Sequence, residues 1–179
     1  MSIIKDLNAL LLLFARMVIK ILILSDTHCR TVKQLPQKVL EEAMKSDVII
    51  HAGDFTSNDV VEAFRCSKTF YGVHGNMDDL KIKMSLPEAE IITLCGFKIG
   101  ITHPADGGSP IGIKKRIKGK FNGNVDAVIF GHTHKSEISH KYGILFLNPG
   151  SLKSGFLPSP RSYMILQVSE KLEPSLIIV

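Results

Sequence analysis

The sequence predicts an α/β protein with two facing mixed β-sheets flanked by helices. In the first half, short apolar runs rich in β-branched residues alternate with helical patterns, which is typical of parallel strands joined by crossover helices. In the second half, paired apolar runs meet at short turns and predict hairpins. A length of 179 residues, with 45% hydrophobic and 22% charged residues, suits one globular domain with its own core.

The first half contains three expected strands and two expected helices. Apolar residues repeat at helical spacing through Gln34–Lys45, and Pro36 suits the first turn of that helix. The second helix begins at Ser57 or Asn58, either of which can cap it, and runs through Ala63. The strands around these helices are expected at Val18–Leu24, Asp47–Ile50 and Thr69–Val73.

The second half is predicted to be rich in hairpins. A further strand is expected at Ala127–Phe130, preceded by a helix over Ile111–Lys120. Hairpins that follow β-α-β units indicate a second sheet facing the first. The hairpins are expected in residues 90–103, turning at Cys95 and Gly96, in residues 136–150, turning at Tyr142 and Gly143, and in residues 162–179.

Charge and cysteine content narrow the possible partners and location. The formal net charge of +5, with a pI of about 9.1, weakly favours anionic ligands. A nucleic-acid partner is not favoured, because such proteins usually concentrate their basic residues in one patch. Cys29, Cys66 and Cys95 are odd in number and lack a CxxC spacing, so we expect no disulfide framework and a cytoplasmic location.

Residues 1–16 are expected to be an extension before a single domain of residues 17–179. The apolar run Ala9–Ala15 is much shorter than the roughly 20 residues that span a bilayer, so no membrane partner is expected. Lys5 is balanced by Asp6 and no cleavage pattern follows, which argues against a signal peptide. The extension is either the product of an upstream start or an amphipathic helix that contributes to a homo-oligomer contact.

Polar residues capable of binding a metal follow the ends of several expected strands. Ligand sites of α/β proteins lie at such ends. In an extended chain, side chains at i and i+2 point the same way, so two residues at this spacing can converge on an ion. Gly53, Gly75 and Gly131 each precede a candidate ligand and let the backbone turn sharply there. The candidate ligands are Asp26, His28, Asp54, Asn76, His103, His132 and His134.

Each of these motifs alone has an ordinary structural explanation. A DxH sequence at a strand end is commonly a turn with a cap, and GD and GN are common turn dipeptides. Five clusters in order, each after a strand, favour a metal site over coincidence. Imidazole, carboxylate and amide ligands together suit Mn, Fe, Zn, Co or Ni better than Mg or Ca.

The motif series also carries a family resemblance. "DTH", "GD", "GNMD", "TH" and "GHTH", followed by "NPGS", resembles the calcineurin-like metallophosphoesterases, most closely their small single-domain bacterial and archaeal phosphodiesterases. The resemblance covers the chain from about Met17 to its end and implies an αββα sandwich with two metal ions. It implies that Asp54 bridges both ions. It also implies that Asp26, His28 and His134 bind one ion, while Asn76, His103 and His132 bind the other.

The resemblance to metallophosphoesterases implies hydrolysis of a phosphate ester by two divalent cations. A water bridging two such ions is hydroxide near neutral pH and can attack phosphorus in line. Asp54, Asn76 and His103 would position this hydroxide and the phosphate, and neutral Asn76 would leave the positive field of the ions intact. A small phosphate ester is therefore the expected substrate, with nucleotides among the candidates.

Several alternatives remain open in the sequence. Many members of the family have a histidine at the position of Met77 that assists the leaving group, so Met77 favours a phosphodiesterase over a phosphomonoesterase. His74 is a candidate replacement acid or a structural residue. Asp78 either orients a ligand or caps a turn, and His51 is expected in the core. The basic run between Lys114 and Lys120 is either a solvated helix face or an attractor for a nucleotide or nucleic acid. A protein-interaction scaffold resembling the retromer subunit of this fold is the alternative to an enzyme.

Overall fold

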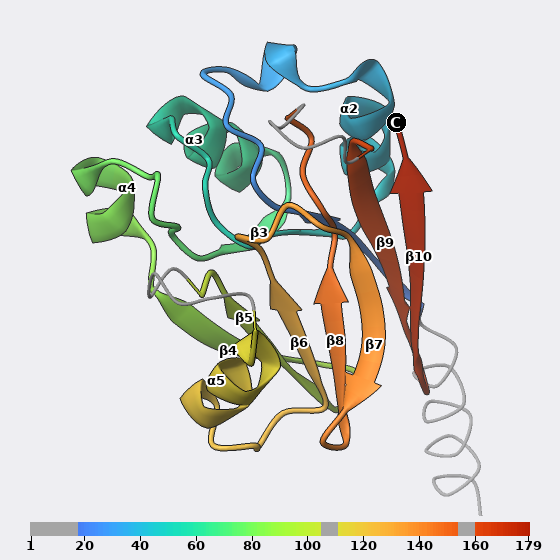
Figure 1. Ribbon diagram of the computed structural model, residues 1–179. Coiled ribbons are helices and arrows are strands. Elements are labelled where there is room, and N and C mark those ends of the chain that lie inside the picture. Colours follow the sequence, from blue (N-terminus) through green and yellow to red (C-terminus); the bar gives the residue numbers. More distant parts are fainter. Residues whose placement is uncertain (1–17, 105–110, 154–159) are drawn as a thin grey trace, which may run out of the picture.

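The computed structural model describes residues 18–104, 111–153 and 160–179. The expectations for residues 1–16 lie outside these ranges. Two five-stranded sheets face one another, with helices packed on their outer sides (Figure 1). The predicted fold class, two facing mixed sheets flanked by helices, is confirmed.

The first sheet contains the three parallel strands predicted for the first half, and β9 pairs with β1 in the antiparallel direction. Its strand order is β10 (Leu172–Ile178), β9 (Ser162–Val168), β1 (Ile19–Leu24), β2 (Val48–His51) and β3 (Thr69–Gly72). Helices α2 (Gln37–Lys45) and α3 (Asn58–Ser67) connect the parallel strands, and a short 3-10 helix, η1 (Val32–Gln34), precedes α2.

The second sheet combines two of the predicted hairpins with one strand that follows a helix. Its strand order is β4 (Ala89–Leu94), β5 (Phe97–Thr102), β6 (Ala127–Phe130), β8 (Ile144–Asn148) and β7 (Glu137–Lys141). Strands β5, β6 and β8 run parallel to one another, so their carboxyl ends share one edge of the sheet. Helix α5 (Ile113–Lys120) leads into β6.

Three apolar clusters hold the layers together. Between the sheets, side chains such as Ile21, Ile50 and Ile129 are fully buried. A second cluster joins the outer side of the first sheet to α2 and α3, where Val39 and Val60 are fully buried. A third cluster joins α5 to the second sheet. Because apolar area removed from water is the main favourable term in folding, this arrangement fixes the sheets relative to one another.

The helix predictions differ from the structure at their boundaries. Helix α3 extends to Ser67 instead of Ala63, and the Ser57 side chain caps it by accepting a hydrogen bond from the Asp59 N–H. Pro36 is the residue before α2 and does not lie in its first turn. The sequence prediction also missed α4 (Leu80–Ser85), which Asp79 caps through the Ile82 N–H. Six residues are too few to show a helical period in the sequence.

Within the described parts of the chain, no helix is both long and apolar enough to cross a bilayer. Cys29 is free and buried, while Cys66 and Cys95 are free and exposed.

Candidate metal centre

Side chains from both sheets meet at the carboxyl ends of the parallel strands. Asp26 and His28 follow β1, Asp54 follows β2, and His132 and His134 follow β6. Asn76 and His103 follow β3 and β5 in the same way. The sheets face one another, so the loops after these strands bring residues that are distant in the chain together.

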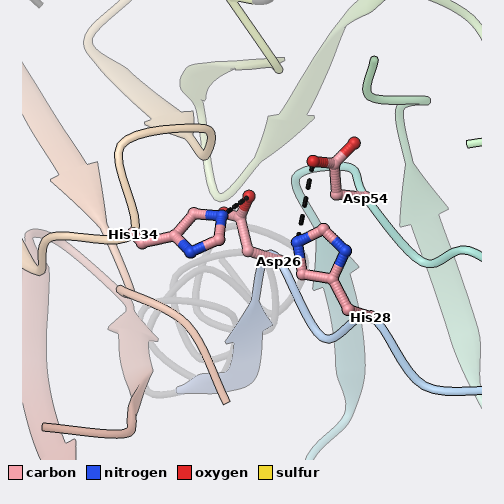
Figure 2. Close-up of side chains that lie close together, drawn as sticks. All are labelled: Asp26, His28, Asp54 and His134. Carbon is pink, nitrogen blue, oxygen red and sulfur yellow. Dashed lines mark ion pairs between the residues drawn. The ribbon is translucent and has the colours of Figure 1, made fainter. Parts of the chain in front are cut away.

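Four of the predicted ligands form one compact group. One ligand atom from each of Asp26, His28, Asp54 and His134 lies within 4.8 Å of the others. The His134 Nε2 atom is 3.1 Å from Asp26 Oδ1, and the His28 Nε2 atom is 3.8 Å from Asp54 Oδ2 (Figure 2). The group has the donor types and spacing to hold a divalent transition-metal ion.

The other three predicted ligands lie beside this group. His103 Nε2 is 3.4 Å from Asp54 Oδ2 and 4.0 Å from Asp26 Oδ1. His132 Nδ1 is 3.1 Å from Asn76 Oδ1, and the His103 and His132 ring centroids are 5.3 Å apart. The structure therefore brings all seven predicted ligands to one place, with Asp54 in contact distance of a histidine in each group.

Unpaired buried atoms are the best reason to expect a cation here. Asp26 Oδ1, His28 Nε2 and His103 Nε2 are buried, and none has a hydrogen-bond partner. The contact of Asp26 Oδ1 with His134 has the distance of a hydrogen bond but not its alignment. Buried polar atoms are nearly always satisfied, and three convergent exceptions fit a metal ion. His103 also places its Nδ1 atom 2.7 Å from the Ala52 carbonyl oxygen, a second contact typical of metal-binding histidines.

The carboxylates and imidazoles shift one another's protonation. Burial alone would raise the pKa of Asp54, but His103 and the Met77 N–H outweigh burial and lower it. Burial disfavours the charged ring of His103, yet Asp54 and Asp26 raise its pKa overall. The carboxylate of Asp26 raises the pKa of His134. A metal ion that binds through these two imidazoles must therefore displace protons.

The remaining two histidines favour the neutral form. Burial is the largest cause that lowers the pKa of His28 and the pKa of His132. Neutral imidazole is the form that binds a metal, so these two rings are already suited to the task.

The backbone at the ligands is not extended, which corrects the reason given for their convergence. The φ angles are positive at Asp26 (51°), His28 (45°), Asp54 (61°), His132 (78°) and His134 (56°). Non-glycine residues adopt this left-handed region rarely, and such residues cluster at functional sites. The i and i+2 side chains converge because the chain turns sharply after each strand.

The three glycines before ligands have two different roles. Gly53 has a φ of 93°, as a sharp turn requires. The chain also turns just after Gly75 and Gly131, but these two glycines do not have positive φ angles. A Cβ atom on Gly75 would lie 2.1 Å from Asp54 Oδ1, and one on Gly131 would lie 1.9 Å from Ser25 Oγ. Glycine is needed at these two positions because the Asp54 carboxylate and the Ser25 hydroxyl pass so close to the backbone.

Asp78 holds the Asp54 loop in place. Its Oδ2 atom accepts hydrogen bonds from the Asp54 N–H (3.0 Å) and the Gly75 N–H (2.7 Å), and its Oδ1 atom accepts one from the Thr56 N–H (2.7 Å). Of the two roles that the sequence left open, the structure favours the orientation of a ligand. Asp78 acts through Asp54, so it is a positioning residue.

Sequence reasoning missed two serines that brace Asp26. The Ser25 hydroxyl donates to Asp26 Oδ2, and the Ser151 hydroxyl donates to the Asp26 carbonyl oxygen at 2.7 Å. The His132 N–H also donates to Asp26 Oδ2, at 3.1 Å. Ser151 belongs to the "NPGS" stretch, where Asn148 bonds the Gly131 carbonyl oxygen. The "NPGS" motif was the feature of the sequence that could have indicated Ser151. No feature of the sequence indicated Ser25.

His51, His74 and Met77 stand close to the candidate ligands in the chain. His51 is fully buried and stacks on Phe55 with ring centroids 3.6 Å apart, which confirms the expected core position. The His74 N–H donates to the Pro87 carbonyl oxygen, and its imidazole lies close enough to lower the pKa of Glu88. The Met77 side chain is 60% exposed, while its N–H donates to Asp54 Oδ1 at 2.8 Å.

The layered fold and the carboxylate–imidazole cluster together define an αββα protein with a group of side chains that could hold a metal ion. Residues 19–171 match the family model described as the calcineurin-like phosphoesterase superfamily domain. The chain belongs to this superfamily, which confirms the resemblance drawn from the motifs. Membership supports a hydrolase of the metallophosphoesterase type.

Individual relatives agree with this assignment. A probable metallophosphoesterase of Methanocaldococcus jannaschii is 39% identical over 158 residues, which are 87% of this chain and 79% of the relative. A phosphodiesterase of the same organism is 30% identical over 168 residues, covering 85% of this chain and 95% of the relative.

Solved structures share the fold. A Thermotoga maritima protein superposes with a TM-score of 0.72 and 34% identity, covering 90% of this chain and 99% of that one. Vacuolar Protein Sorting 29 from Cryptosporidium parvum superposes with a TM-score of 0.70, covering 90% and 98% of the two chains. At 24% identity, the latter similarity concerns the fold alone.

Proposed function

We propose that this protein is a phosphodiesterase that uses two divalent transition-metal ions drawn from Mn, Ni, Fe, Zn and Co. Asp26, His28 and His134 bind one ion, and Asn76, His103 and His132 bind the other. Asp54 binds both. The position of Asp54 Oδ2, 3.8 Å from His28 Nε2 and 3.4 Å from His103 Nε2, is the observation that carries the proposal. The free cysteines fit the proposed cytoplasmic location.

The ions supply an activated water as nucleophile and positive charge beside the phosphate. The protein supplies fixed geometry. Asp54 is held through its carboxylate by the Met77 N–H and through its backbone by Asp78, so its position does not change as charge develops. Asn76 and His103 orient the phosphate and the nucleophile. Asn76 is neutral and leaves the positive charge of the ions available to an anionic substrate.

A diester is the preferred substrate because Met77 offers no proton to a leaving group. The similarity to a phosphodiesterase over 85% of this chain supports the same choice. His74 is the candidate acid that compensates for Met77. Its imidazole lies close enough to Glu88 to lower the pKa of that carboxyl, and this contact favours a structural role for His74 instead. We propose small phosphodiesters as the substrate class, with nucleotides among them.

Metal analysis combined with paired assays tests this proposal. The purified protein is loaded with Mn or Ni, its ions are counted by elemental analysis, and turnover of bis-p-nitrophenyl phosphate is compared with that of p-nitrophenyl phosphate. We expect two ions per chain and preference for the diester. Asp54→Asn should lose metal and activity together, whereas Asp79→Asn, at the exposed cap of α4, should retain both.

Contrary results separate the alternatives. Preference for the monoester would mean that the Met77 argument is wrong and that the protein is a phosphomonoesterase. Absence of turnover with every metal would favour a protein-interaction scaffold. A count of one ion per chain, together with an unchanged metal content in Asp54→Asn, would contradict the bridging role of Asp54.

A further inference from the structure

We propose that a pocket between α5 and the β7–β8 turn is a second binding site, for a ligand that combines phosphate groups with a planar ring, such as a nucleoside diphosphate. The pocket has a volume of about 360 Å³ and is lined by Lys115, Lys118, Gly119, Asn122, Gly123 and Tyr142.

This pocket is separate from the metal centre. Strand β6 starts after α5 and ends next to His132, while β7 starts after His134 and ends at Lys141, the residue before Tyr142. The pocket and the metal centre thus lie at opposite ends of the same strands, and Figure 1 shows α5 and the β7–β8 turn together at one end of the second sheet. A ligand in the pocket would not touch the proposed ions.

The charge of the pocket favours an anion. Lys115 and Lys118 line it, and Lys141, the last residue of β7, places its ammonium group near the ring of Tyr142. Elsewhere on α5, Lys114 pairs with Glu137 and Lys120 pairs with Glu88. Among the residues that the structure describes, no ion pair joins an acidic side chain to Lys115, Lys118 or Lys141. Three neighbouring ammonium groups without a carboxylate form a suitable site for phosphate oxygens.

The ring of Tyr142 supplies a flat surface among these charges. Lys118 Nζ lies 5.0 Å and Lys141 Nζ lies 5.1 Å from its centroid, so the ring is positioned between the helix and the turn. Tyr142 has a φ of 57°, a conformation that costs energy for a bulky residue. Tyr142 is nevertheless 47% exposed, so part of its surface is open to a planar group.

Gly119 is the observation that points most directly to a ligand. Each other described glycine either has a positive φ or would place a Cβ atom against a neighbour. Gly119 has neither property, because a Cβ atom there would meet nothing within 4 Å. Glycine destabilises a helix relative to alanine, so its presence inside α5 has no structural benefit. An open pocket wall is the benefit that remains.

The ligand class follows from these features together. Lysines bind phosphate oxygens, the tyrosine ring accepts a stacked base, and the Asn122 side chain lines the same pocket with both donor and acceptor groups. The volume lies within the range of small-molecule sites. A nucleoside diphosphate has the charge, the flat ring and the size to fill the pocket.

Calorimetric titration of the full chain with α,β-methylene-ADP tests the proposal, because the methylene bridge resists hydrolysis. We expect saturable binding to one site that survives in the Asp54→Asn variant. Methylenediphosphonate, which lacks the ring, should bind about tenfold more weakly. Lys118→Met should weaken binding of the nucleotide about tenfold, while the matched helical control Lys38→Met, at an exposed position of α2, should leave it unchanged.

Two substitutions of Gly119 test the pocket without removing a charge. Gly119→Leu places a side chain in the open space and should abolish binding, whereas Gly119→Ala should bind within about threefold of the parent. Circular dichroism confirms that both variants fold. The proposal is overturned if 1 mM ligand (about the upper end of small-metabolite affinities) gives no binding signal, or if Gly119→Leu binds like Gly119→Ala. Loss of binding in Asp54→Asn alone would place the nucleotide at the metal centre and also overturn it.

Discussion

Replacement of Asp78 by asparagine tests whether this buried carboxylate organises the metal centre. The substitution preserves the size of the side chain and removes its charge. Asp78 is 3% exposed and accepts hydrogen bonds from three backbone N–H groups, those of Asp54, Thr56 and Gly75. An amide has one oxygen, so it can serve either the pair of N–H groups on one side or the single N–H on the other.

The structure sets the expected magnitude. If the amide oxygen takes the Oδ2 position, two hydrogen bonds change from charged to neutral acceptors, which costs about 1 kcal/mol each. The Thr56 N–H then faces an NH₂ group, and its lost partner costs about 1 kcal/mol more, because this N–H is only partly buried. Burial raises the pKa of Asp78, so a neutral side chain recovers part of this loss. We expect a net destabilisation of about 2 kcal/mol.

Urea unfolding of the metal-free protein measures this change. Asp79→Asn is the matched control, since the neighbouring Asp79 caps α4 and asparagine caps helices about as well as aspartate. Asp78→Asn should also weaken metal binding in calorimetric titrations, because the N–H of Asp54 then donates to a neutral amide oxygen and is held less strongly. A difference between the two variants below about 0.5 kcal/mol, the ordinary effect of a surface substitution, would refute the reasoning.

Three further predictions concern the same centre. Gly131→Ala should destabilise the protein by more than about 2 kcal/mol in thermal unfolding, because its Cβ atom would lie 1.9 Å from Ser25 Oγ. Gly119→Ala is the control and should be neutral or stabilising in the same experiment, because its Cβ atom would meet nothing within 4 Å. The pKa values of His103 and His134 are raised above 6.5, so their protonated forms stabilise the metal-free protein below pH 6.5, and this stabilisation is lost as pH rises through the raised values. Metal affinity should rise as the pH increases and these two histidines lose their protons, and binding to the protonated protein should release protons measurably. Equal metal affinity below and above this pH range would contradict the assignment of these ligands. Removal of metal by a chelator should lower the melting temperature, since free metal at 100 times its Kd stabilises a one-site protein by about 2.7 kcal/mol; an unchanged melting temperature would show that the cluster binds no ion.

Much of the fold was predictable because its signals are local. The apolar run of β1 and the turn at Tyr142 and Gly143 each lie within a few residues, so their patterns are visible in the sequence. Helix α4 was missed because one and a half turns show no repeat. The boundary of α3 was missed because packing of Phe64, a buried core residue, extends that helix beyond the predicted end.

The candidate site was predictable in its membership and not in its geometry. All seven candidate ligands were identified from their positions after strands. Their left-handed backbone could not be read from the sequence, since aspartate and histidine adopt many conformations. The close approach at Gly75 and Gly131 likewise depends on neighbours from other strands, Asp54 and Ser25.

The sequence by itself determined the class of fold and which side chains are available to bind metal, because apolar periods and strand-end motifs are properties of neighbouring residues. Only the tertiary structure decided which oxygen of Asp54 faces both halves of the cluster and which residue holds Asp54 in place. The physical reason is distance along the chain. Asp78 reaches Asp54 across 24 positions, because parallel pairing of β2 with β3 places the loops after these strands side by side. His132 reaches Asp26 across 106 positions, because the two sheets pack face to face.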